Sequence, residues 1–340
     1  MSANIDETLG FVALAFTGPR SNIWHKGGQS VDQWIQDNGH PPDLEDWAML
    51  SGTAFTVEAR PLYYHGDCSP GANNGLHEYP NRFANVRTDT GAALGLVSTR
   101  YNLVQPLDVQ STFADIIAAD ERFALTTMAS LDGGKRIMAQ ATFAGEQTVA
   151  GDKHVAKLLM STTFDTTSPT RLQGCMERVV CENTLRVAMG EHAPAINVRH
   201  STKYDRDLAL KQLARIAEGF SQYKQIGDAL ASYVMPKEAL SAFIRGVLDI
   251  PIDAEQKDVS TRKQNQRQAI IDAMLVSCNE RAVTGTSGID AFTALQAITR
   301  YVDHDRDAGN TENRLFGSGA ALKDKALGLL MPMIKDRVAA

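Results

Sequence analysis

The pattern of apolar and polar positions divides the chain into two parts. Up to about residue 200, apolar and polar residues alternate in short runs separated by Gly- and Asp-rich turns, which is typical of antiparallel strands. The predicted strands, in chain order, are 54–64, 83–89, 92–98, 123–130, 137–143, 154–164 and 171–181. A helix over 107–119 is predicted to interrupt them. The capping residues Glu182-Asn183-Thr184 predict a short helix that ends near Gly190.

After Tyr204 the period becomes helical. Leu210, Leu213, Ala217 and Phe220 follow the three-four spacing of an amphipathic helix. Pro236 stands where another helix can begin, because proline is tolerated in a first turn. Three further helices are predicted, at 262–279, 288–302 and 319–338.

These elements predict an α+β protein with an antiparallel, β-hairpin-rich central domain followed by an α-helical C-terminal part. We expect an irregular N-terminal segment (1–80) that packs on the core. A β-rich core domain (81–200) and a helical C-terminal domain (201–340) follow it.

The composition and charge limit the classes of function that the chain can have. The 340 residues are 43% hydrophobic and 22% charged, which are ordinary globular values. The net charge of −6 means that any nucleic-acid site must be a local basic patch. The four cysteines do not form a disulfide framework, and the early apolar run 9–16 is too short to span a bilayer. We therefore expect a protein that stays in the cytoplasm.

Five separated motifs resemble one known family. They are Trp24-His-Lys-Gly-Gly28, Arg82-Phe-Ala-Asn-Val-Arg-Thr-Asp-Thr-Gly91 with the segments to Gln105, Arg178-Val-Val-Cys-Glu-Asn-Thr-Leu185, Arg199-His200, and Leu315-Phe-Gly-Ser-Gly-Ala-Ala-Leu-Lys323. Together they are similar to the phage/plasmid-like protein family, a domain of unknown function, over residues 24 to about 330. The resemblance implies an accessory protein of bacteriophages, prophages or plasmids, and it implies no catalytic residues.

Basic residues gather around the predicted hairpins, where they are candidates for binding a phosphate backbone. The candidates are Lys135, Arg136, Lys153, Lys157, Arg171, Arg178, Arg186, Arg199, His200 and Lys203. Phe164 or Tyr101 could stack on bases. The competing interpretation is that nearby acids, such as Asp132 and Glu177, pair with these charges on ordinary solvated strand faces.

A Gly-Ser-Gly turn that enters the last helix offers free backbone N–H groups at the positive end of the helix dipole. Its candidate phosphate-binding residues are Gly317, Ser318, Gly319 and Lys323. In the alternative interpretation Ser318 is only an N-cap and the glycines permit tight packing.

Catalytic motifs are missing from the sequence: we find no GxSxG, no Cys-His-Asn set and no HExxH. His25 beside Trp24 is best explained by packing. The acidic run Asp303-His-Asp-Arg-Asp307 could hold a divalent cation, but alternate positions at a helix end do not face one another. We expect no cofactor and no metal.

The function predicted from these features is non-catalytic binding of single-stranded DNA. The most concrete form is an ATP-independent single-strand annealing factor of phage or plasmid recombination, acting as a homo-oligomer. The alternative is an interaction protein that antagonises a host defence or regulatory complex. A metal-dependent hydrolase that uses residues 303–307 ranks last.

Overall fold

The structure is a computed structural model. It describes residues 5–18, 27–66, 76–178, 183–186, 195–198, 206–251, 259–280, 289–307 and 310–335. Among these residues no helix has the length and apolar character needed to cross a bilayer.

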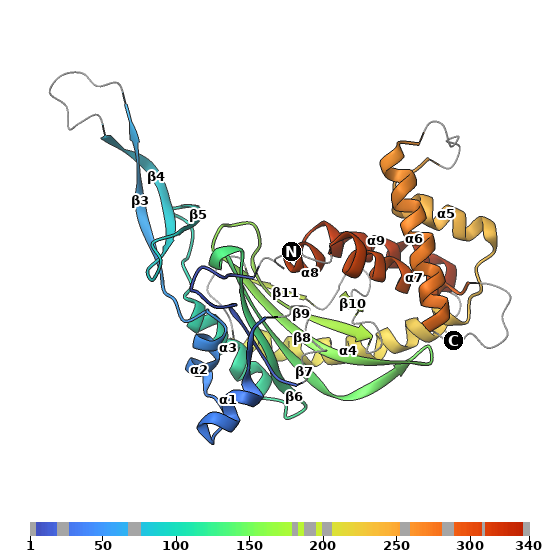
Figure 1. The fold of residues 1–340 in the computed structure, drawn as a ribbon, viewed down its shortest axis with the longest axis horizontal. Coiled ribbons are helices and arrows are strands. Elements are labelled where there is room, and N and C mark those ends of the chain that lie inside the picture. The colour runs from blue at the N-terminus through green and yellow to red at the C-terminus, as the bar shows by residue number, and fades with distance from the viewer. Residues whose placement is uncertain are drawn as a thin grey trace.

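An eight-stranded sheet forms the centre of the molecule (Figure 1). Its strands are β1 (Leu14–Phe16), β2 (Gln29–Ser30), β6 (Phe123–Leu131), β7 (Arg136–Val149), β8 (Asp152–Thr163), β9 (Thr170–Arg178), β10 (Asn183–Arg186) and β11 (Ala195–Val198). The order is β10-β9-β8-β7-β6-β1-β2, and β11 also pairs with β9. All pairs are antiparallel except β1 with β2. The meander β6-β7-β8-β9 is therefore the antiparallel, hairpin-rich centre that the alternating pattern predicts.

The two faces of the sheet have different covers. On one face the long helix α4 (Arg206–Ala231) packs Ile216 and Phe220 into the main hydrophobic core. A Cβ added at Gly174 of β9 would come within 2.9 Å of both side chains, so this close crossing requires glycine. The opposite face carries a smaller apolar cluster, in which Leu159 of β8 packs with Leu315 from the C-terminal helices.

A second sheet projects from the body as an arm (Figure 1). It has the order β3-β4-β5, with β3 at Val57–His65, β4 at Leu76–Arg87 and β5 at Ala93–Ser98. Pro61 lies in the edge strand β3, where the register with β4 shifts, as expected for a residue that cannot donate a ladder hydrogen bond. We call this three-stranded sheet the arm.

Residues 5–66 are more regular than the sequence suggested. They contribute β1 and β2 to the central sheet, the helices α1 (Val31–Asn38) and α2 (Leu44–Leu50), and the first strand of the arm. Ser30 caps α1, and Asp43 and Asp46 form a reciprocal capping box at α2.

Of the remaining helices, α3 lies within the β-rich part, and the others confirm the helical C-terminal part. They are α3 (Pro106–Ala118), α5 (Lys237–Val247), α6 (Thr261–Glu280), α7 (Ala291–Arg300), α8 (Thr311–Leu315) and α9 (Ser318–Leu330), with a π-helical turn at Tyr301–Arg306. Ile116 and Ile117 of α3 are buried.

One element differs from the prediction. Residues Asn183–Arg186 form β10 rather than the start of a short helix. Their backbone completes the open edge of β9, and this pairing outweighs the capping preference of Asn183 and Thr184. The rest of the predicted helix, up to Gly190, lies outside the described residues.

Candidate nucleic-acid interface

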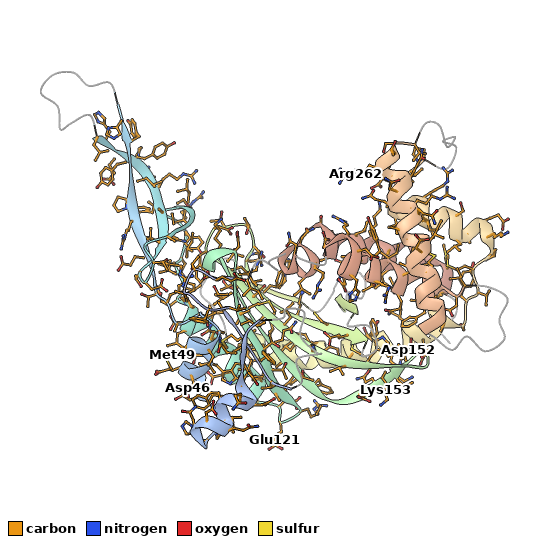
Figure 2. All side chains as sticks on the ribbon, in the orientation of Figure 1. Asp46, Met49, Glu121, Asp152, Lys153 and Arg262 are labelled. Carbon is orange, nitrogen blue, oxygen red and sulfur yellow. The ribbon has the colours of Figure 1, made fainter. Side chains whose placement is uncertain are left out.

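Two described lysines of the predicted basic set lie far apart. Lys135 follows the turn between β6 and β7, and Lys153 pairs with Thr148 near the opposite end of β7, which spans roughly 45 Å. Figure 2 places Lys153 at the end of the β7–β8 hairpin that lies away from the arm. These two lysines therefore stand at opposite ends of the sheet.

Each described lysine of the set has a carboxylate partner. The Nζ atoms of Lys135, Lys153 and Lys157 lie 3.4, 2.7 and 2.8 Å from carboxylate oxygens of Asp132, Glu146 and Glu177, respectively. The hydrogen bond and charge of Glu146 raise the pKa of Lys153. The competing interpretation, that nearby acids compensate these charges, therefore holds for all three lysines.

Among the arginines of the set, the side chain of Arg136 is buried and that of Arg171 is half-buried. Only the backbones of Arg178 and Arg186 are described. Arg136 is buried, and its guanidinium lies over the ring of Phe316 at 4.4 Å. Arg171 lies directly opposite Ser161 in the β8–β9 pair. The backbones of Arg178 and Arg186 pair within β8-β9-β10. Arg199, His200 and Lys203 lie outside the described residues.

The Gly-Ser-Gly turn is at the N-terminus of α9, but protein groups already occupy it. The N–H of Ser318 donates to Asn313 Oδ1 at 2.7 Å. A Cβ on Gly319 would lie 2.4 Å from Asp307 Oδ2, so a carboxylate sits against the first turn. Lys323 is buried and donates to Asp303 at 2.8 Å. Gly317, Ser318, Gly319 and Lys323 are thus tightly packed, as in the alternative interpretation, but the N-cap residue is Gly317 rather than Ser318, and Asn313 accepts from the first turn.

The acidic run is divided between the interior and the surface. Asp303 is buried between Lys323 and Arg314, whose Nε atom lies 3.8 Å away, while His304 and Asp305 are exposed. In the part of the chain that the structure describes, no group of three His, Cys, Asp or Glu side chains is arranged to hold a metal ion. The hydrolase hypothesis therefore has no support from this geometry.

Of the two aromatic residues proposed for base stacking, Phe164 is inaccessible and Tyr101 is only partly exposed. Phe164 is fully buried. The hydroxyl of Tyr101 donates to the carbonyl oxygen of Thr163 at 3.2 Å, and burial raises the pKa of this hydroxyl well above its usual value.

Accessible aromatic rings lie instead on the arm. Tyr64 faces His77 across the β3–β4 pair with ring centroids 5.6 Å apart, and it contacts Tyr79 edge-on at 6.1 Å. Tyr64 is 49% exposed and Tyr79 is 50% exposed. We call Tyr64, His77 and Tyr79 the ring cluster. Tyr63, 55% exposed, precedes Tyr64 on the same strand.

Two arginines follow the ring cluster in the sequence, toward the base of the arm. Arg82 lies opposite Ser98 in the β4–β5 pair, and Arg100 follows two residues after Ser98. Both are exposed, and within the described residues neither has an ion pair or hydrogen bond through its side chain. Arg60, by contrast, is paired with Glu58 at 3.1 Å. The arm therefore combines exposed rings with two arginines that have no ion pair among the described residues.

One sequence feature indicates this site. Tyr63 and Tyr64 end the predicted strand 54–64, shortly after Pro61, where strand pairing and burial are weakest. The pairing partner that carries His77 and Tyr79 was not predicted, because the N-terminal half of β4 is polar and contains Pro80.

Comparison with protein families matches residues 93–323 to a family described as "Domain of unknown function (DUF932)". The match includes β5, the whole meander and most of the helical part, and it begins after the ring cluster. No curated protein and no solved structure matches the chain significantly.

Proposed function

Since this chain belongs to the DUF932 family, whose description assigns no activity, we propose from its own geometry that it is a non-catalytic protein that binds single-stranded nucleic acid through the arm. The observation that carries the proposal is the ring cluster. On one hairpin the ring of Tyr64 contacts both His77 and Tyr79, while the two tyrosines remain about half exposed.

Exposed aromatic groups of this kind suit stacking. A folded protein gains little from tyrosines held in solvent, and gathered exposed apolar groups mark interaction sites. Each base of a single strand has a π-face, so rings on a strand accept any sequence. Duplex DNA hides these faces, which favours a single-stranded ligand.

The positive charges of two arginines on the arm also favour single-stranded nucleic acid as the ligand. Arg82 and Arg100 can contact phosphates without first breaking an ion pair. Because the net charge of the chain is −6, attraction of a polyanion has to come from such a local group. The compensated lysines of the central hairpins contribute little to it.

The biological setting of the proposal rests on the sequence resemblance. In a phage or plasmid protein of the bacterial cytoplasm, a strand stacked on the arm would be presented for pairing, which is the task of an annealing factor. Annealing needs many adjacent sites, so we propose a homo-oligomer whose arms follow one strand.

Binding of a fluorescent oligothymidine, measured by anisotropy across a salt series, tests the proposal. The variant Tyr64→Ala with Tyr79→Ala should raise Kd by about 5- to 150-fold for each stacked base that is lost. Tyr64→Phe with Tyr79→Phe keeps the rings and should bind like the wild type. Replacing Arg82 and Arg100 with Gln should flatten the slope of log K against log salt by about 0.7 per lost phosphate contact.

A matched control removes exposed apolar surface elsewhere. Leu107→Ala in α3 should leave Kd unchanged, because that side chain is 41% exposed but lies outside the arm. If the wild type does not bind the oligonucleotide at low salt, the proposal is wrong, and the arm is then a surface for a protein partner such as a host complex. Binding without faster pairing of complementary strands would keep the binding function and exclude annealing.

A further inference from the structure

A diagonal row of polar side chains crosses the sheet face opposite α4. In the β7–β8 register Arg136 faces Thr163, and Met138 faces Ser161. In the β8–β9 register Leu159 faces Gln173. Because residues directly opposite one another point to the same side, Arg136, Ser161 and Gln173 share one face and are diagonal neighbours. We call these three residues the donor row.

Two members of the donor row each have a buried side-chain atom without a hydrogen bond to the described residues. Ser161 is 1% exposed and Gln173 is 4% exposed. Among the described residues, neither Ser161 Oγ nor Gln173 Nε2 has a hydrogen-bond partner. Buried polar atoms in folded proteins are nearly always paired with protein, water or ligand, so two adjacent exceptions on one face require an explanation.

The surroundings of the donor row favour an anion. Arg136 brings a guanidinium to one end of the row, and Arg171 lies directly opposite Ser161. On the same face Glu177 is already paired with Lys157. A hydroxyl, an amide N–H and guanidinium groups are all donors to oxyanions.

Side chains from the C-terminal helices pack against this face of the sheet and cover the donor row. Leu315 packs with Leu159 and Met138 in the smaller apolar cluster, and Phe316 lies over Arg136. Both residues belong to the short α8 and the turn after it. This cover favours a small ligand.

We propose that the donor row binds a small tetrahedral oxyanion of the phosphate class between the central sheet and the α8–α9 turn. Diagonal neighbours on adjacent strands are separated by roughly 5–8 Å, a gap that one such ion bridges with oxygens on opposite sides. The ion would accept hydrogen bonds from Ser161 Oγ and Gln173 Nε2, with the guanidinium of Arg136 beside it at one end of the row. This site is separate from the arm and does not depend on its proposed function.

Inorganic phosphate is the probe, added to the full chain after dialysis into a phosphate-free, sulfate-free buffer. Isothermal titration should show saturable binding, and the thermal midpoint should rise with phosphate. Ser161→Ala and Gln173→Met should each weaken phosphate binding by about tenfold or more. Without phosphate, Ser161→Ala should unfold at the same midpoint as the wild type or higher, because it removes an unpaired buried hydroxyl.

Thr162→Val is the matched control. Thr162 is the next residue of β8, is fully buried, and bonds Thr170 at 2.8 Å on the other face. This variant should lower the thermal midpoint but keep the phosphate response. The arm variant with Tyr64→Ala and Tyr79→Ala should keep it too, which separates this site from the arm.

Two results would overturn the inference. If phosphate does not bind, or if it binds Ser161→Ala and Gln173→Met as tightly as the wild type, the row holds only internal water. If an oligonucleotide competes with phosphate for the row, the site belongs to a nucleic-acid backbone rather than to a free ion.

Discussion

Arg87 and Asp6, which are 81 residues apart in the sequence, form an ion pair whose two side chains have no solvent exposure. Arg87 is the last residue of β4, so this pair attaches the arm to the strands of the central sheet. The guanidinium also pairs with Asp89 at 2.7 Å and lies over the ring of Phe55 at 4.1 Å. The arm is thus held at its base by a buried cation that is paired on two sides.

Removing one partner of this pair should destabilise the fold. Asp6→Asn leaves Arg87 without its buried counter-charge, and we expect a loss of about 3–5 kcal/mol in the free energy of unfolding. Denaturant unfolding measures it. Glu58→Gln breaks the exposed Arg60–Glu58 pair on the same arm and should change stability by less than about 1 kcal/mol. Equal losses in the two variants would contradict the anchoring role.

The same pair should make stability depend on acid pH. Burial alone would raise the pKa of Asp6, but hydrogen bonds from Thr8 and Arg87 outweigh it and hold this pKa below its usual value of 3.8. A carboxyl with a lowered folded pKa stabilises the fold above its unfolded pKa, and this contribution is lost as the pH falls through the folded pKa.

The difference in stability between wild type and Asp6→Asn should therefore be constant near neutral pH and shrink below about pH 4. Urea unfolding at a series of pH values gives this difference directly. A difference that grows on acidification would show that Asp6 is protonated in the folded protein.

Local patterns were enough to predict most of the elements. The alternation in 123–164 and the turn residues of Asp132-Gly133-Gly134 predict the β6-β7-β8 meander, and the three-four spacing after Tyr204 predicts α4. The Lys153–Glu146 pair is also local, since both residues flank one hairpin turn. The α+β class and its order were therefore available from the sequence.

The candidate sites depend on contacts that no local pattern encodes. Lys323 meets Asp303 only because α9 packs against the π-helical turn. Whether Ser161 and Gln173 share a face depends on the strand register, and whether they find partners depends on what covers that face. Asn183 shows most clearly the limit of prediction from local sequence, because pairing with an open sheet edge overrides its preference for a helix cap.

The buried cluster around Asp303 predicts an asymmetric mutational response. Asp303 is the shared partner of Lys323 and Arg314. Asp303→Asn leaves two buried cations without a counter-charge and should cost about 3–5 kcal/mol. Lys323→Met leaves Asp303 paired with Arg314 and should cost less.

Lys325 provides the control for that comparison. It lies two residues after Lys323 in α9 and pairs at 2.6 Å with Asp249, whose side chain is largely exposed. Lys325→Met should change the free energy of unfolding by less than about 1 kcal/mol. If Lys323→Met proves as harmless as Lys325→Met, the Asp303–Lys323 pair contributes no net stability.

Two glycines of α9 should respond in opposite directions to the same substitution. In Gly319→Ala the new Cβ would lie 2.4 Å from Asp307 Oδ2 and 2.9 Å from the carbonyl oxygen of Asn313, so overpacking should destabilise the protein by about 1–3 kcal/mol. Gly328 is exposed in the same helix, with nothing within 4 Å of an added Cβ. Gly328→Ala should therefore stabilise it by about 0.5–1 kcal/mol, because alanine loses less backbone entropy in a helix. Thermal unfolding of the two variants side by side checks both signs, and a stabilising Gly319→Ala would mean that the first turn of α9 is not packed against Asp307.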